Sequence, residues 1–176
     1  MLVKARRRCV ALRLSSIEAP KSVVRSDVVA EWIGPVCSPT CLGALQLQTV
    51  ADLDRARLMV SRTRPNAWTD WLRCGGGGGN GGGGGGGEGE PGPLRIDESF
   101  EHFYLLIQAA KCGLGLANVP RMLVRDDLNN GTLVASLGFV PGPNKLAIWV
   151  APHLSRRTDV VSLVDWLTDE LRSIER

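Results

Sequence analysis

Residues 99–137, SFEHFYLLIQAAKCGLGLANVPRMLVRDDLNNGTLVASL, are the stretch that decides the fold of this 176-residue chain. Ser99 is a residue type that favours the first position before a helix. Apolar residues follow it at the three- and four-residue intervals of a helix face: Phe100, Phe103, Ile107 and Ala110. Gly113 suits the left-handed conformation that ends a helix. The pattern therefore predicts one helix from Ser99 to Gly113.

The residues after this helix predict alternating strands and helices. The apolar run 114–119 predicts a short strand, and Pro120 suits the first turn of a helix over 120–128. Strands are expected over 132–137 and 146–151, before a last amphipathic helix that Thr158 caps. This alternation is typical of an α/β sheet covered by helices.

Upstream, the same reasoning predicts shorter elements. Residues 27–39 form an extended segment interrupted at Gly34-Pro35, and 58–61 a buried strand. Thr49 and Asp52 have the spacing of a capping box for a helix over 49–56. Further elements are expected as a short helix capped by Asn66 that ends at Cys74, and a strand over 94–96.

Residues 75–93 contain two glycine runs and an acidic, proline-containing end. Glycine loses the most backbone freedom on folding and brings no side chain to bury, so a flexible insertion into a surface turn is expected. We expect four segments: a basic, disordered leader over 1–26, one part of a domain over 27–74, the insertion over 75–93, and the rest of the domain over 94–176.

The charge is uneven along the chain. Residues 1–25 carry seven basic residues and one acidic residue, whereas the whole chain has a net charge of +3. A basic arm is able to meet nucleic acid or a membrane surface, but no helix-turn-helix or zinc-finger pattern accompanies it, which favours a solvated leader. Its apolar run is too short for a signal peptide, and no stretch has the apolar length of a membrane helix. We expect a cytoplasmic protein.

No motif indicates catalysis, a metal or a cofactor. The five cysteines lack metal-ligand spacing, and neither His102 nor His153 sits at ligand spacing from another candidate. Gly113-Leu114-Gly115 follows a helix, unlike a phosphate-binding loop, which joins a strand to a helix. The tryptophans are interpreted as packing residues. A non-enzymatic protein with reduced thiols and no cofactor is expected.

The stretch 99–134 (SFEHFYLLIQAAKCGLGLANVPRMLVRDDLNNGTLV), together with LAIWVAP and VDWLTDEL, resembles the second half of the effector-binding domain of LysR-type transcriptional regulators. Upstream, EWIGPVCSP, LQTVADLDRARLMV and RPNAWTDWL are similar to the segments that precede it. The resemblance runs from about Asp27 to Arg176, and points to the branch that regulates glycine cleavage and beta-lactamase induction.

The resemblance implies a periplasmic-binding-protein-like (type 2) fold of two α/β lobes with a small-molecule effector in the cleft. DNA is bound in the family by an N-terminal winged helix-turn-helix, which residues 1–26 do not match; the opening strands of the first lobe are also unmatched. We therefore expect an incomplete, N-terminally truncated effector-binding domain that does not bind DNA alone and is able to pair with intact LysR-type protomers. The positions that match effector-lining residues are Phe100, His102, Phe103 and Ala147.

Other interpretations remain open at this point. Asp97, Glu98 and Glu101 place negative charge where the helix from Ser99 begins, which suits a solvated helix start and disfavours an anionic effector. A solute-binding transport protein would share the architecture, and a non-functional gene fragment would explain the glycine run and the unmatched leader.

Overall fold

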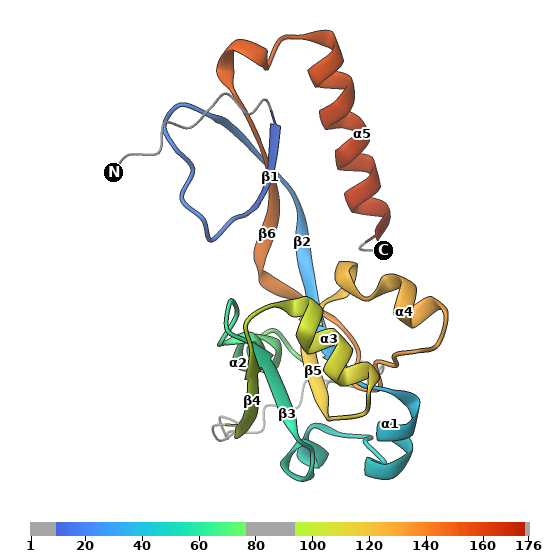
Figure 1. Cartoon of the computed structure of the whole chain (residues 1–176). Helices are drawn as coiled ribbons and strands as arrows, with labels where there is room; N and C mark the ends of the chain where they lie inside the picture. Colours follow the sequence, from blue (N-terminus) through green and yellow to red (C-terminus); the bar gives the residue numbers. More distant parts are fainter. Residues whose placement is uncertain (1–9, 77–93, 175–176) are drawn as a thin grey trace. The chain divides into compact units, whose positions relative to one another are not determined.

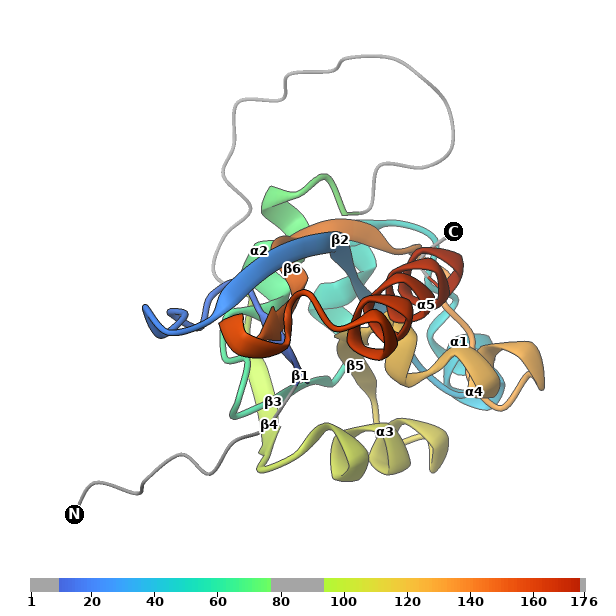
Figure 2. The ribbon, with the colours of Figure 1, turned by 90° about the horizontal axis from the view of Figure 1, so that it is seen from above.

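A computed structural model describes residues 10–76 and 94–174 (Figures 1 and 2), which fall into two compact units. The first unit combines the chain up to Glu31 with the chain from Pro143 onward, and the second is Trp32–Gly142. Strands β2 (Val24–Val36) and β6 (Val140–Val150) contribute residues to both units.

The second unit is an α/β sheet with helices against it, as predicted. Strand β3 pairs in parallel with β4 and β5, and β5 pairs antiparallel with the end of β2. Its elements in chain order are α1 (Pro39–Leu45), the 3-10 helix η1 (Val50–Arg55), β3 (Leu58–Ser61), α2 (Ala67–Arg73), β4 (Ile96–Phe100), α3 (Phe103–Lys111), β5 (Leu116–Pro120), the 3-10 helix η2 (Arg121–Leu123) and α4 (Arg125–Asn129).

Two apolar clusters form the core of the second unit. One surrounds Trp68 and Trp71 of α2, whose rings meet edge to face with centroids 6.2 Å apart. Both indole nitrogens donate to backbone carbonyls, Trp68 to Met59 at 3.0 Å and Trp71 to Gly138 at 3.3 Å. The other cluster packs the buried face of α3 against β3 and β5. The prediction that these two tryptophans are packing residues is confirmed.

The turn between α3 and β5 depends on two glycines. Gly113 has a φ of +77°, the left-handed conformation predicted for it. A Cβ atom at Gly115 would lie 2.3 Å from the carbonyl oxygen of Arg57, so only glycine permits β5 to start this close to β3. The Gly-Leu-Gly motif is therefore a helix end followed by a close backbone approach.

The first unit is smaller. Strand β1 (Val10–Leu14) pairs antiparallel with β6, with Val10 opposite Val150 and Leu14 opposite Leu146. A 3-10 helix, η3 (Pro152–Leu154), and the long helix α5 (Thr158–Ile174) follow β6. The expected disorder of the leader is therefore wrong for residues 10–14, which pair with β6, and for 24–26, which belong to β2. Residues 1–9 of the leader and 77–93 of the glycine insertion lie outside the described residues.

Three local predictions need correction. Ser99 lies in β4 and the helix begins at Phe103, because the segment 96–100 pairs with the buried strand β3. Residues 132–137 form only an isolated bridge, from Val134 to Cys37. The helix expected over 120–128 is divided into η2 and α4, after a strand that includes Pro120.

The extended segment begins and ends three residues earlier than predicted, and β2 continues unbroken through Gly34-Pro35 to Val36. On α5, Trp166 is 60% exposed and is therefore not a packing residue within the described chain. Within residues 10–76 and 94–174, no helix combines the length and apolar character that a membrane crossing requires.

Candidate functional site

Three parallel strands of the second unit end at one edge of its sheet. Ser61, the last residue of β3, is paired with Phe100, the last residue of β4, and β5 runs in the same direction to Pro120. The carboxyl ends of parallel strands are where open α/β sheets bind ligands, because the loops and helix starts that follow them gather there. We call this place the carboxyl edge.

Hydroxyl groups occupy the end of β3 at the carboxyl edge. The side-chain oxygens of Ser61 and Thr63 lie 2.8 Å apart, and Ser61 is fully buried. The backbone N–H of Thr63 donates to the Ser61 hydroxyl oxygen at 3.3 Å, and the N–H of Arg62 donates to the Phe100 carbonyl at 2.8 Å. The loop that leaves β3 is therefore held against β4 in a defined conformation.

One exposed ion pair borders the carboxyl edge. The Arg62 guanidinium contacts the Glu101 carboxylate, and its Nε lies 3.4 Å from the Ser99 hydroxyl. An exposed pair of this kind contributes at most about 1 kcal/mol to stability. Its consequence here is electrostatic, because the cation offsets part of the negative charge that the sequence places near the start of α3.

The predicted site residues of this unit differ in their surroundings. His102 is the residue before α3; its carbonyl accepts from the N–H of Leu106 at 3.2 Å, and its exposed side chain makes no capping hydrogen bond. Phe100 and Phe103 are half-buried and pack against the α3 cluster. The structure thus brings these three residues together at the carboxyl edge, with the imidazole of His102 open to solvent.

The fourth predicted residue, Ala147, lies in the other unit. It is fully buried in β6 and is paired with Arg13 of β1. It therefore does not belong to the group that Phe100, His102 and Phe103 form in the second unit.

Asn118 of β5 is a feature that sequence reasoning missed. Its side chain is fully buried, and neither its Nδ2 nor its Oδ1 has a hydrogen-bond partner among the described residues. A buried amide without a partner costs about 1–3 kcal/mol, so such groups occur where a ligand or water satisfies them, or where function retains them. The signal in the sequence was one asparagine inside the apolar run LGLANV.

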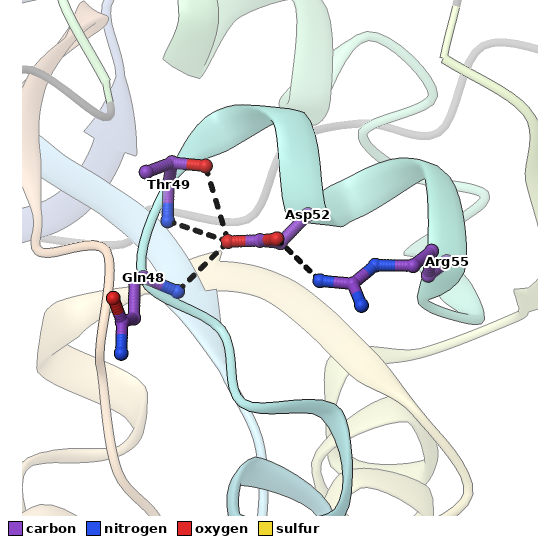
Figure 3. Close-up of polar contacts among 4 residues, drawn as sticks. All are labelled: Gln48, Thr49, Asp52 and Arg55. Atoms are coloured by element: carbon purple, nitrogen blue, oxygen red, sulfur yellow. Dashed lines mark hydrogen bonds and ion pairs between the residues drawn. The ribbon is translucent and has the colours of Figure 1, made fainter.

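The carboxylate of Asp52, which accepts several hydrogen bonds, has a structural role. Asp52 of η1 accepts hydrogen bonds from the backbone N–H groups of Gln48 at 3.0 Å and Thr49 at 2.9 Å, and from the Arg55 guanidinium at 2.5 Å (Figure 3). These bonds, the backbone ones first, hold the pKa of Asp52 well below its ordinary value. The predicted capping box is confirmed, and the Asp52 carboxylate stabilises the start of η1.

The thiols of Cys37 and Cys41 are equally unsuited to chemistry. Burial raises the pKa of Cys37 to about 12, and burial also raises the pKa of Cys41. A thiol with a raised pKa carries little thiolate and is a poor nucleophile. Within the described ranges, no three potential metal ligands gather into a group. What the carboxyl edge offers is hydrogen bonding and apolar contact, which are means of binding a ligand.

The chain is similar to curated and structurally known regulators. Over 147 residues it is 34% identical to the HTH-type transcriptional regulator TrpI of Pseudomonas aeruginosa. The matched region covers 82% of this chain and 45% of TrpI. The regulatory domain of CrgA, a LysR-type transcriptional regulator from Neisseria meningitidis, superposes with a TM-score of 0.65 at 15% identity, over 93% of this chain and 75% of that domain. The chain belongs to the LysR-type transcriptional regulators. It spans less than half the length of the relative TrpI.

Within the LysR-type family, the chain corresponds to the effector-binding domain. The AmpR effector-binding domain from Citrobacter freundii has the same fold, with a TM-score of 0.68 at 21% identity, over 93% of this chain and 74% of that domain. The expected periplasmic-binding-protein-like α/β fold is thus confirmed. The chain matches no family model. Its relatives are named as transcriptional regulators, which agrees with the expectation of a protein that is not an enzyme.

Proposed function

We propose that this chain senses a small polar effector for a LysR-type regulator, and that the effector binds at the carboxyl edge of β3, β4 and β5. The observation that carries the proposal is the unsatisfied buried amide of Asn118 in β5; the Ser61–Thr63 hydroxyl pair at the end of β3 and the exposed imidazole of His102 support it. A few convergent polar groups beside apolar side chains are typical of small-molecule sites.

The roles of the predicted residues follow from their surroundings. Phe100 and Phe103 would supply apolar contact, and His102 a hydrogen-bond donor whose charge changes near neutral pH. Ala147, which is buried in β6 of the first unit, stays a predicted effector-lining residue. The Arg62–Glu101 pair presents both signs of charge, which suits a zwitterionic or uncharged polar effector better than a simple anion.

The wider role rests on the family. We propose a cytoplasmic protein that pairs with intact LysR-type protomers and in which effector binding is coupled to DNA through the family's N-terminal winged helix-turn-helix. The domain division also remains a proposal: 27–74 and 94–176 as parts of the effector-binding domain, with 75–93 as an insertion. Cross-linking with a full-length relative tests the pairing, since only separate species would appear if the two chains do not associate.

The binding proposal is tested by thermal unfolding in the presence of amino acids, organic acids and cell-wall fragments. At least one compound is expected to raise the melting temperature, and His102→Ala is expected to reduce that increase. Gln108→Ala is the matched control, because Gln108 is exposed on the same helix but lies away from its start. The proposal fails if no compound stabilises the protein, or if both variants respond alike.

A further inference from the structure

A groove of about 530 Å³ opens in the second unit, at the end of the sheet opposite the carboxyl edge. Arg57 and Gly115 line it, and they immediately precede β3 and β5. Because these strands are parallel, the groove lies at their amino ends. Lys111 also lines the groove. It is separated from His102 by the length of α3, about 13 Å at 1.5 Å per residue. We call the groove the amino-end groove.

The charge of the amino-end groove is one-sided. Three cationic side chains line it and none of its lining residues is acidic; the cations are Arg55, Arg57 and Lys111. A volume in this range is typical of sites for small organic molecules. A concave surface lined by one sign of charge focuses the field and concentrates ions of the opposite sign.

The cations of the groove retain donors for a ligand. Each pairs with one carboxylate that does not line the groove: Arg55 with Asp52 at 2.5 Å, Arg57 with Glu98 at 2.6 Å, and Lys111 with Asp127 at 2.7 Å. A guanidinium has five N–H donors and an ammonium has three, so a single contact uses only part of either group. These carboxylates hold the cations in place and leave them able to bind a second anion.

Neutral residues complete the lining. Thr40 and Ser38 add hydroxyl groups, and the Ser38 oxygen accepts from the N–H of Cys41 at 3.2 Å, which leaves its own hydrogen to donate. An apolar side is formed by Ala44, Leu45 and Leu114, and Leu114 is 50% exposed. The groove therefore has one cationic part and one apolar part.

The Gly-Leu-Gly turn forms part of this groove. A Cβ atom at Gly113 would lie 3.4 Å from the Ser38 hydroxyl oxygen, and one at Gly115 would overlap the Arg57 carbonyl. Gly115 thus lets the turn lie directly against Arg57, while Gly113 lies within ordinary contact distance of Ser38. The motif contributes to a binding surface without being a strand-to-helix phosphate loop.

We propose that the amino-end groove is a second ligand site that takes a small organic anion. The charged group of the ligand, a phosphate or a pair of carboxylates, meets the cations, and its apolar part lies on Leu114 and the α1 side chains. This site is separate from the effector site of the proposed function, since the two lie at opposite ends of α3.

The proposal is tested by nuclear magnetic resonance titration of the full chain with phenyl phosphate, inorganic phosphate and succinate. Phenyl phosphate is expected to shift the amides of 40–45 and 111–115, with a dissociation constant at least tenfold below that of inorganic phosphate, because only the former reaches the apolar side. Binding of succinate in place of the phosphates would assign the charged group as a carboxylate pair. If none of the three probes shifts these amides, the proposal is overturned.

Matched variants separate binding from structural effects. Lys111→Gln is expected to weaken binding at least fivefold. Thr40→Asp is expected to abolish binding, because its carboxylate would repel the anion. The variant should still fold, since an acidic residue in the first turn of α1 is compatible with the helix. Glu98→Gln is expected to strengthen binding severalfold, because it frees Arg57. Arg73→Gln, a cation of the same unit that does not line the groove, should leave binding unchanged. Equal weakening by Arg73→Gln and Lys111→Gln, or weaker binding after Glu98→Gln, would refute the site.

Discussion

The two units differ in how well they bury their apolar side chains. The second unit has two clusters with large, fully buried residues, among them Trp68 and Trp71. The first unit has one small cluster around Ile148 and Val150 of β6, and α5 leaves Trp166 60% exposed and Val161 42% exposed. The comparison indicates that the second unit supplies most of the stability of the described chain, while α5 leaves apolar side chains exposed.

Replacing Trp71 by Ala is expected to give the largest effect. The indole is fully buried against Trp68 and bonded to Gly138, so the free energy of unfolding should fall by about 3–5 kcal/mol. Chemical denaturation measures this. Trp166→Ala in the first unit should change it by no more than about 0.5 kcal/mol, as for other surface positions. Equal losses would contradict the difference between the units.

Ile148→Ala tests whether the first unit opens on its own. Ile148 is 1% exposed in β6, so its truncation should cost about 2–4 kcal/mol. Hydrogen exchange is expected to accelerate in β1 and β6 around Val150, and to stay slow in β3 and β5. Acceleration throughout both units would show that they unfold together.

Asn118→Leu should stabilise the second unit. The substitution removes a buried amide without partners and keeps a similar volume, so the unfolding free energy should rise by about 1–2 kcal/mol. Under the proposed function the same variant loses its stabilisation by effector. A loss of stability in the absence of any ligand would mean that the amide has a structural partner, and the argument for a polar site would lose its main support.

The link between α3 and α4 predicts a pH dependence within the second unit. Lys111 at 2.7 Å, and then the Thr132 hydroxyl at 2.8 Å, hold the pKa of Asp127 below its ordinary value. A lowered folded-state pKa stabilises the protein above the unfolded-state value of about 4, and this contribution disappears as the pH falls through the folded-state pKa. Asp127→Asn should cost about 1 kcal/mol at pH 7 and flatten the profile below pH 4. Thermal melts between pH 2 and pH 7 compare the two proteins.

A small stabilising effect is expected from Gly43→Ala. Gly43 lies inside α1 with nothing within 4 Å of an added Cβ atom, so alanine should stabilise the second unit by about 0.5–1 kcal/mol. Gly113→Ala at a φ of +77° is the contrasting variant, since it should destabilise. A rise in unfolding free energy for both would mean that backbone strain at Gly113 is not important.

The order of elements was predictable wherever local signals agreed with burial. The Thr49–Asp52 capping box, Gly113 at the end of α3 and the strand over 58–61 are all found as expected. The prediction failed at Ser99, because pairing with β3 outweighed the helix-capping preference of a serine. Residues 10–14 were also missed, since their strand depends on β6, more than a hundred residues away.

The candidate site was only partly visible in the sequence. The family resemblance located Phe100, His102 and Phe103 near the start of α3, where the structure has them. Asn118 and the Ser61–Thr63 hydroxyl pair could not be found this way, because a sequence shows neither the burial of a side chain nor its hydrogen-bond partners. The amino-end groove could not be found from the sequence either, because Arg57, Lys111 and Gly115 come together only when β3 and β5 pair.

The most direct test of the account is an amide chemical-shift map of the full chain with a compound that raises its melting temperature. We expect the shifts to concentrate at the ends of β3 and β4 and the start of α3, including Ser61, Phe100 and His102, and to weaken in Asn118→Leu. Shifts confined to other parts of the second unit, with no change at these residues, would contradict the location of the effector site at the carboxyl edge.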